Sequence, residues 1–116
     1  MRSMLWAFAV TFCCLGSPAE AAGIQLLDAD PALSGAIWYP CAVEPTHVAL
    51  GRLSVPTVDR LQGAKDCPVS GAKLRLVVVS HGNGGYFALH LDLIEALANA
   101  GFIVAAINHQ IGRAHV

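Results

Sequence analysis

Residues 74–85 read LRLVVVSHGNGG, an apolar, β-branched run followed at once by a glycine-rich turn. Because the run from Leu74 to Ser80 does not alternate with polar residues, it predicts a strand covered on both faces. Apolar residues then recur at helical spacing from about Tyr86 to Ala100, and Gly101 is placed to end that helix. Residues 102–107 read FIVAAI, a second strand of the same kind. The order strand, loop, helix, strand predicts a βαβ unit with a right-handed crossover, and so an α/β fold.

The residues before this unit carry weaker signals. Residues 24–27 and 36–39 are short apolar runs that predict strands, the second of which stops at Pro40. Residues 41–70 contain prolines, glycines and scattered polar side chains, and we expect an irregular surface segment there. Within it, residues 48–50 and 53–55 are candidates for short extended pieces.

Composition excludes several classes of protein. The chain has 116 residues, of which 55% are hydrophobic and 13% charged, and its net charge is −1. This balance indicates one globular domain rather than a disordered segment. It offers no basic surface for nucleic acid. No apolar run reaches the roughly 18 residues that a membrane-spanning helix needs.

The first 21 residues have the pattern of a signal peptide. Arg2 supplies a positive start, residues 4–15 form the apolar centre, and residues 19–21 read AEA, an A-x-A cleavage signal. We therefore expect an exported protein whose mature chain begins at Ala22, the alternative being an uncleaved anchor. The mature chain keeps two cysteines, Cys41 and Cys67, and neither belongs to a C-x-x-C pair, so a metal site has little support. In an oxidising compartment they can form a disulfide, and two unpaired buried thiols are the alternative.

The glycine-rich loop after residue 80 has several interpretations. A dinucleotide fingerprint would need glycine where Phe87 stands, and the Gly-Lys-Ser/Thr of a phosphate-binding P-loop is missing. The His-Gly-x-Gly-Gly of residues 81–85 fits the oxyanion loop that follows the third strand of α/β-hydrolases. A glycine-rich turn without chemistry is the remaining alternative.

Several segments combine into a resemblance to a known family: residues 38–40 (WYP), 80–85 (SHGNGG), 90–92 (HLD), 95–98 (EALA) and 100–109 (AGFIVAAINH). Together they resemble bacterial secreted proteins described as dienelactone-hydrolase-like, which are α/β-hydrolases similar to platelet-activating-factor acetylhydrolases. The resemblance extends from about Gly23 to His109. It implies a serine esterase that acts on small-molecule or lipid esters without a cofactor. It also implies an oxyanion hole at Gly82, Asn83 and Gly84, with the N–H of Asn83 as the donor.

The catalytic triad of such an enzyme is not found in the 116 residues. There is no G-x-S-x-G, and the triad of α/β-hydrolases follows the oxyanion loop in the order serine, acid, histidine. His81, His90 and His109 all precede the place of the serine, so we do not assign any of them as the catalytic base; His81 is expected to brace the loop. Where we expect the family to continue with Pro-Gly-Asp, residues 110–116 read QIGRAHV. The last six residues match one translation of a common sequencing adapter.

We therefore expect residues 22–109 to be the N-terminal portion of an α/β-hydrolase domain, with residues 110–116 as a non-native tail. The predicted function is an exported carboxylic-ester hydrolase, which this fragment alone cannot perform because it lacks the nucleophile. The alternative is a non-catalytic exported binding or structural domain built on the hydrolase scaffold.

Overall fold

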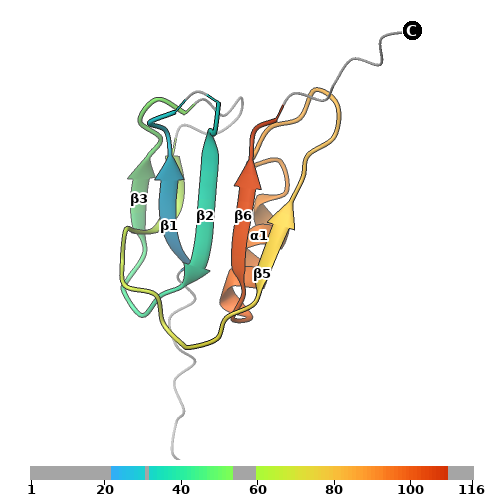
Figure 1. The fold of residues 1–116 in the computed structure, drawn as a ribbon. Helices are drawn as coiled ribbons and strands as arrows, with labels where there is room; N and C mark the ends of the chain where they lie inside the picture. The colour runs from blue at the N-terminus through green and yellow to red at the C-terminus, as the bar shows by residue number, and fades with distance from the viewer. Residues whose placement is uncertain (1–21, 31, 54–59, 110–116) are drawn as a thin grey trace, which may run out of the picture.

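The structure is a computed structural model that describes residues 22–30, 32–53 and 60–109. The predicted signal peptide and the predicted non-native tail lie outside these residues. The described part contains six strands and one helix (Figure 1): β1 (Ala22–Leu27), β2 (Gly35–Pro40), β3 (Thr46–Ala49), β4 (Arg60–Lys65), β5 (Leu76–Val79), α1 (Leu91–Asn99) and β6 (Ile103–Ile107). The strands form one sheet in the order β3-β4-β1-β2-β6-β5.

The sheet mixes parallel and antiparallel pairs. Strand β5 pairs with β6 in parallel, from Leu76 opposite Ile103 to Val79 opposite Ala106, while β2 runs antiparallel to both β6 and β1. Helix α1 connects β5 to β6 and lies behind the sheet in Figure 1, with β6 to the left of β5. This is the right-handed crossover of a βαβ unit. The predicted α/β fold is confirmed, and its sheet is mixed.

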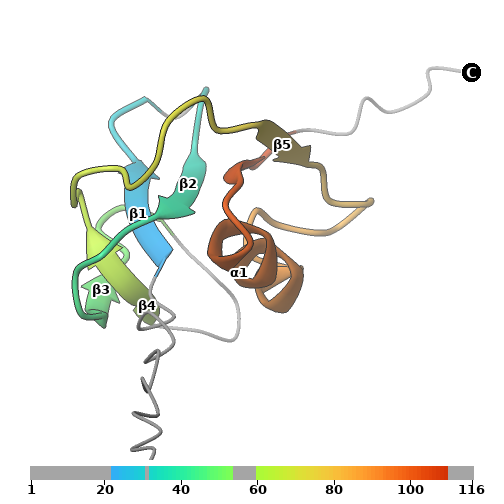
Figure 2. The same cartoon turned by 90° about the horizontal axis from the view of Figure 1, so that it is seen from below.

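Helix α1 packs against one side of the sheet, over β2, β6 and β1 (Figure 2). Its buried side chains, Ile94 and Ala98, stand four residues apart and so share one helix face. The core beneath them is large and apolar, and its largest fully buried members are Trp38, Phe87, Ile24, Leu61, Ile94 and Val104. Full burial of a large apolar side chain contributes about 1.5–3 kcal/mol, so this face dominates the stability of the βαβ unit.

The end of α1 follows the prediction, but its start does not. Gly101 has φ +99° and donates its N–H to the carbonyl of Ala98, while Phe102 donates to that of Leu97. These two bonds are the Schellman arrangement, which favours glycine at the left-handed position. The predicted start near Tyr86 is wrong, because residues 86–90 form turns and the helix begins at Leu91. The segment before the helix is held by other contacts: the N–H of Leu89 donates to the carbonyl of Tyr86 in a turn, and the N–H of Phe87 donates to the side chain of Asn108, just after β6.

Two other expectations need correction. Residues 41–70 are not irregular throughout, because β3 and β4 pair antiparallel, and β4 also pairs in parallel with β1. Of the extended piece expected at residues 48–50, the first two residues belong to β3 and Leu50 follows the strand, whereas the piece at 53–55 lies mostly outside the described residues. Strand β5 is not covered on both faces: Leu76 is 63% exposed and Val78 66% exposed, since no described element packs on that side.

No helix among the described residues has both the length and the apolar character to cross a membrane.

Candidate functional site

The glycine-rich loop lies at the edge of the sheet where β5 and β6 both end. The two strands are parallel, so their carboxyl ends meet at one edge, at the top of the view in Figure 1. Residues 80–90 leave β5 there, and Asn108 and His109 leave β6 beside them. Ligands of open α/β sheets bind at this edge, so the loop stands where the sequence predicted a site.

A tight turn forms the tip of the loop. The N–H of Gly85 donates to the carbonyl of Gly82 over 3.0 Å, and Gly84, the third residue of the turn, has φ +73°. A positive φ at this position is what a type II turn requires. A Cβ atom at Gly85 would lie 2.9 Å from the Cβ of His81 and 3.0 Å from the carbonyl oxygen of Gly82. The last glycine is therefore required for packing and Gly84 for its backbone conformation.

His81 braces this turn from the inside. Its side chain is buried, with 8% of its surface exposed. Its Nδ1 lies 2.9 Å from the carbonyl oxygen of Gly82, and its Nε2 accepts a hydrogen bond from the N–H of His109 over 3.2 Å. A carbonyl can only accept and an N–H can only donate, so these two partners require the neutral imidazole with its proton on Nδ1. The ring also stacks on that of His109, with 4.2 Å between centroids and 14° between planes.

The far end of the loop is held by Asn108. Its side-chain oxygen accepts the N–H of Phe87 over 2.7 Å. Its side-chain nitrogen lies 3.2 Å from Oγ of Ser34, and its own N–H donates to the carbonyl of Ser34 over 2.7 Å. Phe87 is buried, and its ring lies 6.1 Å from that of Trp38. Residues 81–87 are thus fixed at both ends to the end of β6.

Between these anchors the predicted oxyanion residues Gly82, Asn83 and Gly84 are exposed. Among the described residues, no carbonyl or side chain accepts a hydrogen bond from their three backbone N–H groups. Nothing lies within 4 Å of the position of a Cβ on Gly82 or Gly84. Free N–H groups on a rigid turn can stabilise a developing negative charge without reorganisation. The structure thus brings the three residues together in one open turn.

The sequence analysis did not predict several contacts of the site. Oγ of Ser80 lies 2.8 Å from Nε2 of His109, both residues being exposed at the end of their strands. Asn108 and His109 were not expected to hold the loop, although the predicted parallel pairing of β5 and β6 puts the residues after β6 beside the loop that follows β5.

His90 stands before the first turn of α1 and makes no capping hydrogen bond with its side chain. Among the described residues, no three His, Cys, Asp or Glu side chains cluster as metal ligands would.

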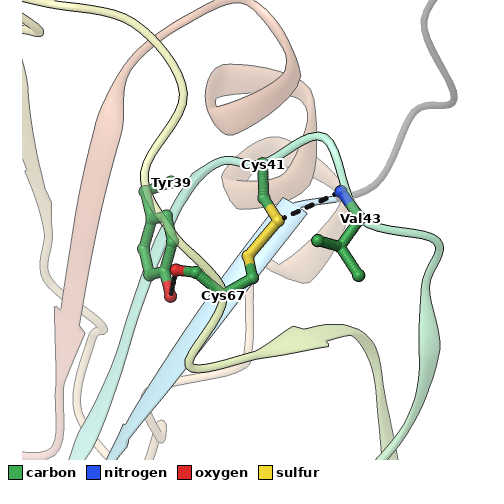
Figure 3. Close-up of a disulfide and its surroundings, with 4 residues drawn as sticks. All are labelled: Tyr39, Cys41, Val43 and Cys67. Atoms are coloured by element: carbon green, nitrogen blue, oxygen red, sulfur yellow. Dashed lines mark hydrogen bonds between the residues drawn. A yellow bond between two sulfur atoms is a disulfide. The ribbon is translucent and has the colours of Figure 1, made fainter.

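The predicted disulfide is present, at the opposite end of β2 from the loop. Cys41 and Cys67 are bonded, with 6.5 Å between their Cα atoms. Figure 3 shows Tyr39 beside this bond, with its hydroxyl donating to the carbonyl of Cys67 over 2.8 Å. Burial and, second, the carboxylate of Asp66 raise the pKa of Tyr39 above its usual value, so this phenol remains a donor well into the alkaline range. The bond ties β2 to the segment that leads into β5.

Comparison with known proteins identifies a family. Residues 45–115 match the model of the family described as platelet-activating factor acetylhydrolase, isoform II. No curated protein and no solved structure matches the chain. The matched residues include β3 to β6, the glycine-rich loop and both of its anchors. Since the match covers more than half of the chain, the chain belongs to the platelet-activating factor acetylhydrolase, isoform II family.

Proposed function

We propose that this chain is the N-terminal portion of an exported serine hydrolase of carboxylic esters, with the N–H of Asn83 as one donor of its oxyanion hole. The observation that carries the proposal is the exposed turn at residues 82–84, whose N–H groups have no acceptor among the described residues. The membership of a lipid-ester hydrolase family agrees with it. The family match does not favour the alternative, a non-catalytic binding domain.

The proposed reaction uses a G-x-S-x-G elbow, which the 116 residues do not contain. The serine of a G-x-S-x-G elbow, an acid and a histidine base would come from the continuation of the reading frame beyond His109, in place of residues 110–116. Attack of the serine on the ester carbonyl converts its oxygen to an oxyanion, which the N–H of Asn83 stabilises. Loss of one such donor typically lowers the rate about 10²–10³-fold. The substrate is a small-molecule or lipid ester, with acetylated glycerophospholipids and dienelactones as the two classes to compare.

The first test is the complete gene. Sequencing the source DNA beyond codon 109 is expected to reveal G-x-S-x-G followed by an acidic residue and a histidine. An intact gene that ends at Val116 would contradict the proposal. Export is tested on the same material, since N-terminal sequencing of protein from outside the cytoplasm should begin at Ala22.

The second test locates the nucleophile. Ser80 and His109 form a hydrogen-bonded serine–histidine pair within this chain, so the structure itself supplies one competing candidate. The 116-residue chain should not hydrolyse p-nitrophenyl acetate above a buffer-plus-albumin control. A fluorophosphonate probe should label the complete protein at the serine of the elbow, as peptide mapping would show. Labelling at Ser80 would instead make the Ser80–His109 pair the reacting group.

A further inference from the structure

The carbonyl of Gly82 receives two hydrogen bonds, one from a side chain and one from the backbone. Nδ1–H of His81 donates over 2.9 Å and the N–H of Gly85 over 3.0 Å. The same peptide group carries the N–H of Asn83, the donor of the proposed oxyanion hole. His81 therefore contacts the peptide group whose N–H would bind the oxyanion, and it does so from the buried side of the loop.

This contact fixes where the N–H of Asn83 points. The peptide group is planar and trans, so its N–H and C=O point in opposite directions. Because the carbonyl is directed inward to His81, the N–H is directed outward to the exposed side of the turn. Hydrogen bonds received by a carbonyl also polarise the amide and strengthen its N–H as a donor. Orientation and donor strength thus depend on Nδ1–H of His81 together with the N–H of Gly85.

The orientation of His81 is set in turn by the end of β6. The N–H of His109 holds Nε2, and the stacked ring of His109 fixes the imidazole plane. On its other side, the space at Gly85 is too small for a Cβ. A flip of the imidazole about χ2 would put Cδ2 in the place of Nδ1 and break both of its hydrogen bonds, so these two bonds hold the ring in its present orientation.

We propose that His81 is a positioning residue, held in its Nδ1–H form by the backbone of His109, that aims and polarises the N–H of Asn83 toward an anionic oxygen. The inference rests on the proposed function, because the oxyanion forms only in the complete hydrolase. It goes beyond that function by giving a role in the reaction to a residue that does not touch substrate.

Two substitutions separate this role from simple packing. In His81→Asn the side-chain amide nitrogen takes the place of Nδ1 and keeps the donor to Gly82, but the stacked ring is lost. In His81→Phe the ring remains to stack on His109, but both nitrogens are lost. His90→Phe, at an exposed position with no side-chain cap bond, is the matched control.

Kinetics with p-nitrophenyl acetate in the complete protein give the first readout. His81→Phe should lower kcat about tenfold, less than removal of a whole donor, with KM changed less than twofold. His81→Asn should recover most of this loss, and His90→Phe should equal the wild type. Full activity of His81→Phe together with a defect in His81→Asn would show a packing role and overturn the inference.

NMR of the complete protein gives a readout independent of hydrolysis. The ¹⁵N shifts of His81 should show a protonated Nδ1 and a bare Nε2, and the amide of Asn83 should shift in His81→Phe but not in His81→Asn. A bare Nδ1 would overturn the inference even if the complete protein is an esterase. If the complete protein hydrolyses no ester, the proposed function fails, and the NMR result alone decides whether His81 orients this amide.

Discussion

At the scale of single residues, the glycines of the loop differ in what they contribute. A methyl group added at Gly85 would press on His81 and on the carbonyl of Gly82, whereas one added at Gly82 would meet nothing within 4 Å. Gly85→Ala should therefore lower the free energy of unfolding by about 1–3 kcal/mol, the usual cost of overpacking. Gly82→Ala, its matched control, should change it by less than about 0.5 kcal/mol. Urea unfolding of both variants checks this, and equal stability would show that the loop adapts freely.

The same residues show how far the sequence could predict the site. The run His-Gly-x-Gly-Gly after a strand was enough to predict a tight glycine turn at the end of β5, because the pattern is local. The protonated nitrogen of His81 could not be predicted, since it depends on the N–H of His109, 28 residues away. The role of Asn108 could not be predicted either. Its side chain bonds to Phe87, 21 residues away in the sequence, and to Ser34, 74 residues away.

At the scale of elements, the disulfide closes the segment that contains β3 and β4. Cys41 and Cys67 are 26 residues apart, and closing a loop of this length is worth about 3.5 kcal/mol in the chain-entropy model. Double substitution of both cysteines by alanine should lower the free energy of unfolding by a comparable amount. Thiol titration of unreduced mature protein should find no free thiol. Two reactive thiols in that sample would contradict the bond.

Helix α1 carries a like-charge pair that should be destabilising. Burial, and second the carboxylate of Asp92 three residues earlier, raise the pKa of Glu95. A carboxyl with a raised folded pKa is destabilising when ionised, and the penalty disappears as pH falls through that pKa. Glu95→Gln should thus stabilise the protein at pH 7 by about 0.2–0.5 kcal/mol, the size of a repulsive helix pair. The gain in Tm should shrink toward pH 4. A gain that does not change with pH would show that the ionised carboxylate of Glu95 is not its cause.

The strands and the helix show which elements a local pattern can predict. Strands β5 and β6 and the end of α1 at Gly101 follow from apolar runs and one left-handed glycine. Strand β4 was missed because its sequence, RLQGAK, has little apolar character and is held by pairing with β3 and β1. The strands that pair with β4 lie outside its own stretch of sequence, so the residues of β4 alone do not show that they form a strand.

At the scale of the whole molecule, the end of the sheet at β5 is covered on one side only. Helix α1 buries the side of β5 and β6 that carries Val104 and Ala106. On the other side, Leu76 and Val78 of β5 are mostly exposed. Strand β5 is also the last strand of the sheet, so one row of its backbone groups has no strand partner among the described residues. An exposed apolar edge of this kind is a template for pairing with another chain.

We therefore predict that the 116-residue chain self-associates through β5. Val78→Lys places a charge on this edge and should raise the monomer fraction in analytical ultracentrifugation, because a lysine cannot be buried in a second sheet without a large desolvation cost. Leu93→Lys is the matched control: Leu93 is 54% exposed, but it lies on α1, away from the strand edge. It should leave the association unchanged. If the unmodified chain is a monomer with a sharp, cooperative thermal transition, its open face and edge are compatible with an independently stable fold, and the prediction is wrong.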